Sequence, residues 1–149
     1  MISLPSRQDR HFPCTSCYGH FAMLNAIDHV VVTVTDLELS IDFYTRVLGL
    51  DAHYHDATRT DLCLDGFALR LHGPEASAAR PAESPVPGSQ TLGFRSSLPL
   101  AEVKAHLEAL AIPMELAPGA TPDDIETWSS LYVRDPDGNL IEISRPRRR

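Results

Sequence analysis

The sequence predicts an α+β fold in which two paired βαβββ modules form a curved, cup-like mixed sheet with helices outside. Short β-branched segments alternate with only two helical patterns, and the same order of elements occurs twice. Shifting the sequence by 62 places sets Leu48 on Leu110 and His29 on Thr91. Identity between the two copies is thin, so the repeat rests on element order, length and periodicity. Two such sheets placed side by side are expected to curve around a shared cleft.

The composition is that of one acidic domain. The chain has 149 residues and a net charge of −7, and residues 23–144 hold 19 acidic against 7 basic side chains, a balance of −12. A surface this negative repels phosphate backbones, which argues against nucleic-acid binding. No apolar run approaches the roughly 18 residues of a membrane helix, and the chain opens without the apolar stretch of a signal peptide. We therefore expect a cytoplasmic protein that binds no membrane.

The domain boundaries follow changes in composition. Residues 1–22 show no periodicity and are predicted to be a disordered extension, whereas the pattern sharpens at "MLNAIDHVVVTV". The stretch "GPEASAARPAESPVPG" reads as a linker. The prediction is a single domain at 23–146, with module one at 26–73, the linker at 74–88, module two at 89–144, and a basic tail at 147–149.

The first module is expected to contain four strands and one helix. Residues 27–34 are β-branched and predict the first strand. Thr35 and Glu38 have the spacing of a capping box, and apolar residues then follow at helical spacing up to Gly49. Further strands are predicted at 50–55, 59–64 and 67–72, the last two joined by the turn pair Asp65-Gly66.

The second module repeats this order. Its elements are predicted to be a strand at 90–96, a helix marked by Leu100, Val103, Leu107 and Leu110, a short strand at 114–116, and two strands, "WSSLYVRD" and "NLIEIS". The last two flank the turn Asp135-Pro136-Asp137-Gly138, whose proline suits a type I turn.

Strand parity indicates which side chains face the cleft. On the final strand Ile141 and Ile143 make an apolar face, which turns Glu142 toward the cleft. On the strand at 67–72 the same argument places Arg70 and His72 on the inner face. Parity alone does not orient His29.

Two imidazoles and a carboxylate converging from three strands make a facial triad with open coordination positions. Such a site suits Fe(II), Mn(II), Ni(II) or Zn(II) and lets a substrate with two neighbouring oxygens bind the metal. The alternative is that each histidine is an ordinary strand residue bonded to a carbonyl group. From spacing alone, both readings stay open.

Two stretches, "IDHVVVTVTDLELSIDFYTRVLGLDA" and "SLYVRDPDGNLIEIS", resemble the opening and closing motifs of the vicinal oxygen chelate superfamily, which includes glyoxalase I, extradiol dioxygenases and bleomycin-resistance proteins. The segment "SPVPGS" and the "LH" ending of the fourth strand are most similar to short glyoxalase-domain virulence proteins. The resemblance implies one divalent metal ion bound by His29, His72 and Glu142. The fourth family ligand position falls on Thr91, or on Gln90 if the register differs by one.

Other side chains have possible roles beside this triad. The resemblance implies that Tyr132 contacts the substrate, where its hydroxyl would donate to an oxyanion; it is equally a half-buried strand residue. Arg70 is a candidate for binding a substrate carboxylate, and Thr91 for lining the same site. Glu142 is a catalytic candidate only if it can leave the metal. His53 and His55 are either proton-transfer groups or surface histidines.

A second group of metal-ligand types, "HFPCTSCYGH" at residues 11–20, is more conspicuous. Zinc sites usually separate two ligand pairs by a longer segment, so that a fold encloses the ion. We expect this run not to be the functional site.

The resemblance and the triad together predict a metal-dependent small-molecule enzyme, either a glyoxalase-like lyase or an extradiol-type dioxygenase. The alternative is a metal-free binding protein of the bleomycin-resistance kind. The resemblance also implies a homodimer, and the linker is long enough for the two chains to exchange modules.

Overall fold

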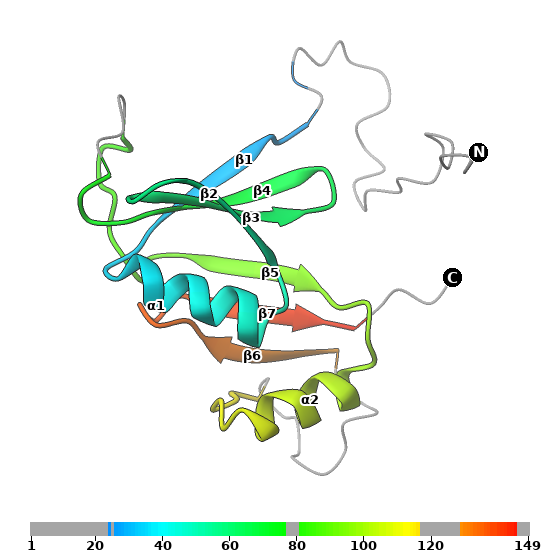
Figure 1. Ribbon diagram of the computed structural model, residues 1–149. Helices are drawn as coiled ribbons and strands as arrows, with labels where there is room; N and C mark the ends of the chain where they lie inside the picture. Colours follow the sequence, from blue (N-terminus) through cyan, green and yellow to red (C-terminus); the bar gives the residue numbers. More distant parts are fainter. Residues whose placement is uncertain (1–23, 25, 77–80, 117–128, 146–149) are drawn as a thin grey trace.

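The structure is a computed structural model that describes residues 24, 26–76, 81–116 and 129–145 (Figure 1). The predicted extension at 1–22, with its histidine and cysteine run, and the tail at 147–149 lie outside the described residues.

Module one forms a mixed four-stranded sheet (Figure 1). Its strands run in the order β1-β4-β3-β2, with β1 and β4 parallel and the other neighbours antiparallel. The helix between the first two strands continues from an α-helical into a π-helical segment. The elements are β1 (His29–Thr33), α1 (Leu37–Asp42), η3 (Phe43–Val47), β2 (Asp51–Asp56), β3 (Arg59–Leu64) and β4 (Phe67–His72).

Module two repeats this order with a smaller sheet. Its elements are β5 (Thr91–Arg95), α2 (Leu100–Ala109), β6 (Ser130–Arg134) and β7 (Leu140–Ser144), and the sheet order is β5-β7-β6. The predicted strand at 114–116 is reduced to one bridge between Glu115 and Tyr132. That bridge lies beside β6, where β2 lies beside β3 in module one. The α+β class is confirmed.

The helix of module one begins one residue later than the capping box predicted. Asp36 is the N-cap, and its carboxylate accepts from the backbone N–H of Leu39 at 2.9 Å. Thr35 instead donates its backbone N–H to the carboxylate of Asp137, 3.0 Å away in the β6–β7 turn. The predicted cap residue therefore joins the two modules.

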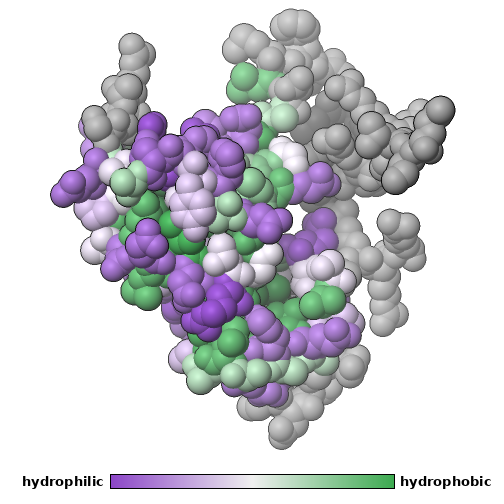
Figure 2. All heavy atoms as spheres, viewed as in Figure 1, coloured by the Kyte–Doolittle hydropathy of each residue, from purple (hydrophilic) through white to green (hydrophobic). Residues whose placement is uncertain are grey.

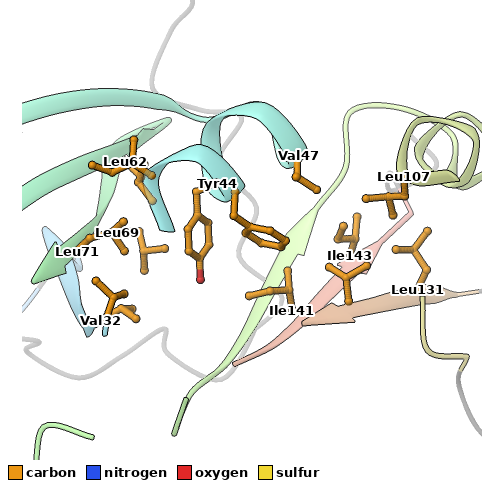
Figure 3. Close-up of a cluster of buried hydrophobic side chains, with 14 of the residues drawn as sticks. Val32, Tyr44, Val47, Leu62, Leu69, Leu71, Leu107, Leu131, Ile141 and Ile143 are labelled. Carbon is orange, nitrogen blue, oxygen red and sulfur yellow. The ribbon is translucent and has the colours of Figure 1, made fainter. Parts of the chain in front are cut away.

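The apolar faces of both sheets belong to one core. Figure 3 shows Tyr44 and Val47, from the helix of module one, between side chains of the two sheets. The buried residues of the first sheet include Val32, Leu62, Leu69 and Leu71, and those of the second include Leu131, Val133, Ile141 and Ile143. Strand alternation then directs the polar face of each sheet away from this shared core.

A buried polar network fixes the two modules at one point. The Tyr44 hydroxyl donates to Asp135, which is 5% exposed, across 2.9 Å. The Asn139 side chain donates to the same carboxylate at 2.8 Å and accepts from the backbone N–H of Gln90 at 2.8 Å. Burial and the neighbouring carboxylates raise the pKa of Tyr44 far above its ordinary value, so its hydroxyl stays a donor.

On the face drawn in Figure 2, hydrophilic residues separate several apolar areas. Within the described part of the chain, no helix is long and apolar enough to cross a membrane.

Candidate functional site

The polar face of the β1–β4 sheet, called here the first polar face, collects charged and imidazole side chains from four strands. The register places Val31, Arg70 and Asp61 side by side on β1, β4 and β3, and His53 of β2 opposite Asp61. Because opposite residues point to the same side of a sheet, these side chains share one face.

Arg70 and Asp61 form the central ion pair of this face. The Arg70 guanidinium donates Nε–H to Oδ1 at 2.6 Å and Nη2–H to Oδ2 at 2.9 Å. Asp61 is only 9% exposed and lies 2.8 Å from Nε2 of His55. The hydrogen bonds from Arg70, and then His55, hold the pKa of Asp61 well below its usual range. The same pairing raises the pKa of Arg70.

His29 lies against the outer edge of that guanidinium. Its Nε2 is 3.4 Å from Nη1 of Arg70, and its Nδ1 is 2.8 Å from the carboxylate of Asp28. A carboxylate accepts and an arginine only donates, which assigns the ring hydrogen to Nδ1 and leaves the Nε2 lone pair facing Arg70.

His72 lies farther along the same face. In the parallel β1–β4 pair His29 is opposite Ala68, whereas His72 is opposite Thr33. The two histidines are thus four strand positions apart, roughly 13 Å at about 3.3 Å per residue. Burial, then the charges of Arg59 and Arg70, lowers the pKa of His72. Its ring lines a cavity of about 330 Å³ beside the proline-rich linker.

Glu142 occupies the polar face of the second sheet, called here the second polar face. It accepts from the hydroxyl of Ser130 at 2.6 Å and from that of Tyr132 at 3.4 Å. Tyr132 is its cross-strand neighbour on β6, while Thr91 is exposed at the start of β5, opposite Leu140. Glu142 and Tyr132 are therefore in contact, with Thr91 at the edge of the same face.

The predicted metal ligands are not gathered within one chain. The strand register separates His29 from His72, and Glu142 belongs to the other sheet. In the described ranges, no three His, Cys, Asp or Glu side chains lie close enough together to hold a metal ion. The residues of a single chain therefore do not fit the divalent ion that the resemblance implied.

The sequence reading missed Asp61. A usable signal was present, because Asp61 and Arg70 each lie four residues from the ends of the Asp65-Gly66 turn. A two-residue hairpin turn sets such residues opposite each other, and opposite charges then pair across the strands.

Comparison with known proteins identifies the family. The chain belongs to the Glyoxalase/Bleomycin resistance protein/Dioxygenase superfamily, whose model matches residues 26–143.

Two curated relatives cover most of the chain. It is 37% identical over 123 residues to Virulence protein STM3117 of Salmonella typhimurium, which is 83% of this chain and 85% of that protein. It is 35% identical over 121 residues to Glyoxalase domain-containing protein RDO1 of Mycosarcoma maydis, which is 81% of this chain and 68% of that protein.

Solved structures agree with the fold. The crystal structure of the Salmonella typhimurium virulence protein has a TM-score of 0.70 at 35% identity, covering 83% of this chain and 98% of the other. A lactoylglutathione lyase from Agrobacterium tumefaciens has a TM-score of 0.60 at 26% identity, covering 83% and 96%.

Proposed function

We propose that this protein binds a small molecule carrying two neighbouring oxygens on the first polar face, with Arg70 and His29 as the anchoring side chains. One observation carries the proposal: the Arg70 guanidinium is fixed by Asp61 and keeps N–H groups that none of the described residues occupies. Its side chain is 26% exposed, so a ligand can reach it. A fixed guanidinium recognises paired oxygens better than a mobile one, because little side-chain entropy is lost on binding.

The family supports a small ligand. The lactoylglutathione lyase is named for a small-molecule reaction, and the acidic composition of this chain disfavours a polyanionic partner.

The second polar face is proposed to complete the site from a second copy of the chain. Within one chain Glu142 and Tyr132 belong to a different sheet from Arg70, and the buried residues of the two sheets form one core. In a homodimer the second polar face of one chain can lie over the first polar face of its partner. Tyr132 would then donate to a ligand oxyanion, and Glu142 would be the basic group nearest the ligand.

Metal-dependent lyase or dioxygenase activity is a second candidate, and it would need ligands from two chains and a displaced Arg70, because the described residues of one chain do not fit the ion. It is favoured by the hydrogen bond from Nδ1 of His29 to Asp28, because a carboxylate orients many metal-binding histidines in this way. Oxygen uptake with Fe(II) and a catechol would indicate the dioxygenase, whereas a glyoxalase consumes no oxygen.

Ligand binding tests the main proposal. A panel of 2-hydroxy acids, 2-oxo acids, catechols and hemithioacetals is titrated while amide chemical shifts are followed. We expect at least one class to bind, and Arg70→Gln to weaken its binding at least tenfold. Arg46→Gln is the matched control, because Arg46 also pairs side-on with an aspartate, Asp42, but on the helix surface. No binding by any class, or equal losses in both variants, would overturn the proposal.

Mixing variants tests the two-chain site. A heterodimer of Arg70→Gln and Glu142→Gln chains contains one doubly altered site and one intact site if each site combines faces from two chains. Mixing after mild unfolding and refolding is then expected to restore part of the binding that both parents lack. If each site belongs to one chain, mixing restores nothing, and light scattering shows whether a dimer forms at all.

A further inference from the structure

We infer that Arg70 takes the place of a metal ion in this chain, and that its guanidinium binds the carboxylate of a 2-oxo or 2-hydroxy acid. The inference rests on the proposed small-molecule site and specifies the chemistry of its ligand.

The first argument is steric. A divalent ion bound to an imidazole lies about 2.0–2.1 Å from the ligating nitrogen, along its lone pair. The only free lone pair of His29 is on Nε2, and Nη1 of Arg70 is 3.4 Å from that atom. An ion in this direction would lie far inside the contact distance of the Arg70 nitrogen. His29 therefore cannot bind a metal unless Arg70 moves away.

The second argument is that the ion pair with Asp61 holds Arg70 in this position. Both oxygens of Asp61 accept from it, and Asp61 is nearly buried. If Arg70 turned outward, His55 would be the one partner left to that carboxylate among the described residues. A carboxylate that loses its main charged partner in a buried position is strongly disfavoured. A metal at His29 would therefore have to overcome the loss of the Arg70 pair with Asp61 as well as repulsion from the displaced guanidinium.

The third argument counts donors. An arginine has five N–H groups. Among the described residues, Asp61 takes two and His29 takes one, which leaves two, one on Nη1 and one on Nη2. With one N–H group left on each Nη nitrogen, the guanidinium can still donate to the oxygens of a carboxylate. The hydroxyl on the adjacent carbon of a 2-hydroxy acid would then donate to the Nε2 lone pair of His29, whereas a 2-oxo acid is held through its carboxylate alone.

The fixed positive charge of Arg70 makes the site prefer anionic ligands over neutral ones, a preference that a metal site lacks. A neutral diol or catechol can chelate a metal, but it cannot neutralise a guanidinium. Carboxylate-bearing ligands are therefore expected to bind more tightly than neutral ligands with the same oxygen spacing.

The experiment combines a ligand arm with a metal arm, both on the full chain. Pyruvate and lactate are titrated in the presence of EDTA, with methyl pyruvate as the neutral analogue. We expect the acids to bind with the same affinity with and without EDTA, and the ester to bind at least tenfold more weakly. Arg70→Gln is expected to lose at least tenfold in pyruvate affinity, and Arg46→Gln to lose none. In the metal arm, protein dialysed against Zn²⁺ or Co²⁺ is expected to retain less than a stoichiometric amount.

Failure of this inference differs from failure of the proposed function. Retention of one metal per chain that is lost in His29→Ala, or pyruvate binding that disappears in EDTA, would overturn the role of Arg70 while leaving a small-molecule site. Tighter binding of catechol than of pyruvate would do the same. If no acid, diol or hemithioacetal binds, the proposed site itself is wrong.

Discussion

At the scale of single residues, the site depends on one cross-strand ion pair. Sequence reasoning placed Arg70 on the face of its strand opposite Leu69 and Leu71, and these two leucines are buried in the structure. The sequence alone does not predict the contact between Arg70 and His29, because that contact depends on the parallel register of β1 and β4. A shift of a few positions in that register would have set His72 beside His29 instead. Periodicity fixes the face of a residue but not its position along the neighbouring strand.

The depressed pKa of Asp61 predicts a pH-dependent stability. A carboxyl whose pKa is lower in the folded state stabilises the fold above its unfolded pKa of about 3.9, and this contribution declines as the pH falls below that value. Asp61→Asn is expected to lower the free energy of unfolding at pH 7 by about 2 kcal/mol, because it leaves Arg70 without its partner. The variant should also show a flatter dependence on pH between 7 and 3, measured by urea unfolding.

Asp56→Asn is the matched control. Asp56 also pairs with an arginine, Arg59, but its side chain is 39% exposed, and solvent screens the pair. Equal pH profiles for the two variants would contradict the view that burial makes the Asp61 pair important.

At the scale of elements, local signals were most informative where one face of a strand is buried. The strands at 59–64 and 67–72 were predicted with the observed boundaries, because the Asp65-Gly66 turn and the alternation agree. The helix cap was misplaced by one residue. Thr35 and Asp36 are both good N-caps, and only the distant Asp137, which binds Thr35, decides between them.

The buried hydroxyl of Tyr44 predicts a cost for its removal. Tyr44→Phe deletes a donor to the nearly buried carboxylate of Asp135. A lost hydrogen bond to a buried charged group costs about 1.5–3 kcal/mol. We expect the free energy of unfolding to fall by about 2 kcal/mol in chemical denaturation. Tyr54→Phe, at an exposed position, is expected to change it little; similar losses in both variants would argue against the network.

Two glycines with nearly the same positive φ allow the cost of backbone strain to be measured separately from the cost of a steric clash. Gly49 has φ +73° and Gly88 has φ +74°. A Cβ at Gly49 meets no atom within 4 Å, whereas one at Gly88 collides with the carbonyl oxygen of Asp137. Gly49→Ala is expected to cost about 1 kcal/mol from backbone strain alone. Gly88→Ala is expected to cost clearly more and to loosen the β6–β7 turn, as measured by thermal unfolding and amide exchange; an equal cost for both would rule out the clash.

At the scale of the whole molecule, the repeat was predictable but the way the modules meet was not. The order of elements follows from periodicity, and the structure shows β1–β4 with one helix in module one and three strands, one helix and an isolated bridge in module two. The sequence also suggested that all predicted ligands converge in one cleft, but the strand register separates them. The helix of module one lies between the apolar faces of both sheets, where its buried side chains Phe43, Tyr44 and Val47 join one core cluster with residues of both. That arrangement directs the two polar faces away from a common core.

A shared core predicts that the modules unfold together. Leu69 and Ile141 belong to different modules, yet both are fully buried in the same cluster. Truncating either to alanine is expected to cost about 3 kcal/mol. In calorimetry at a fixed protein concentration, both variants should shift one transition whose calorimetric and van't Hoff enthalpies agree. Leu39→Ala, at an exposed helix position, is the control and should shift it little. Two transitions, each moved by only one variant, would mean that each module carries its own core, and the two polar faces would then be free to reorient within a single chain.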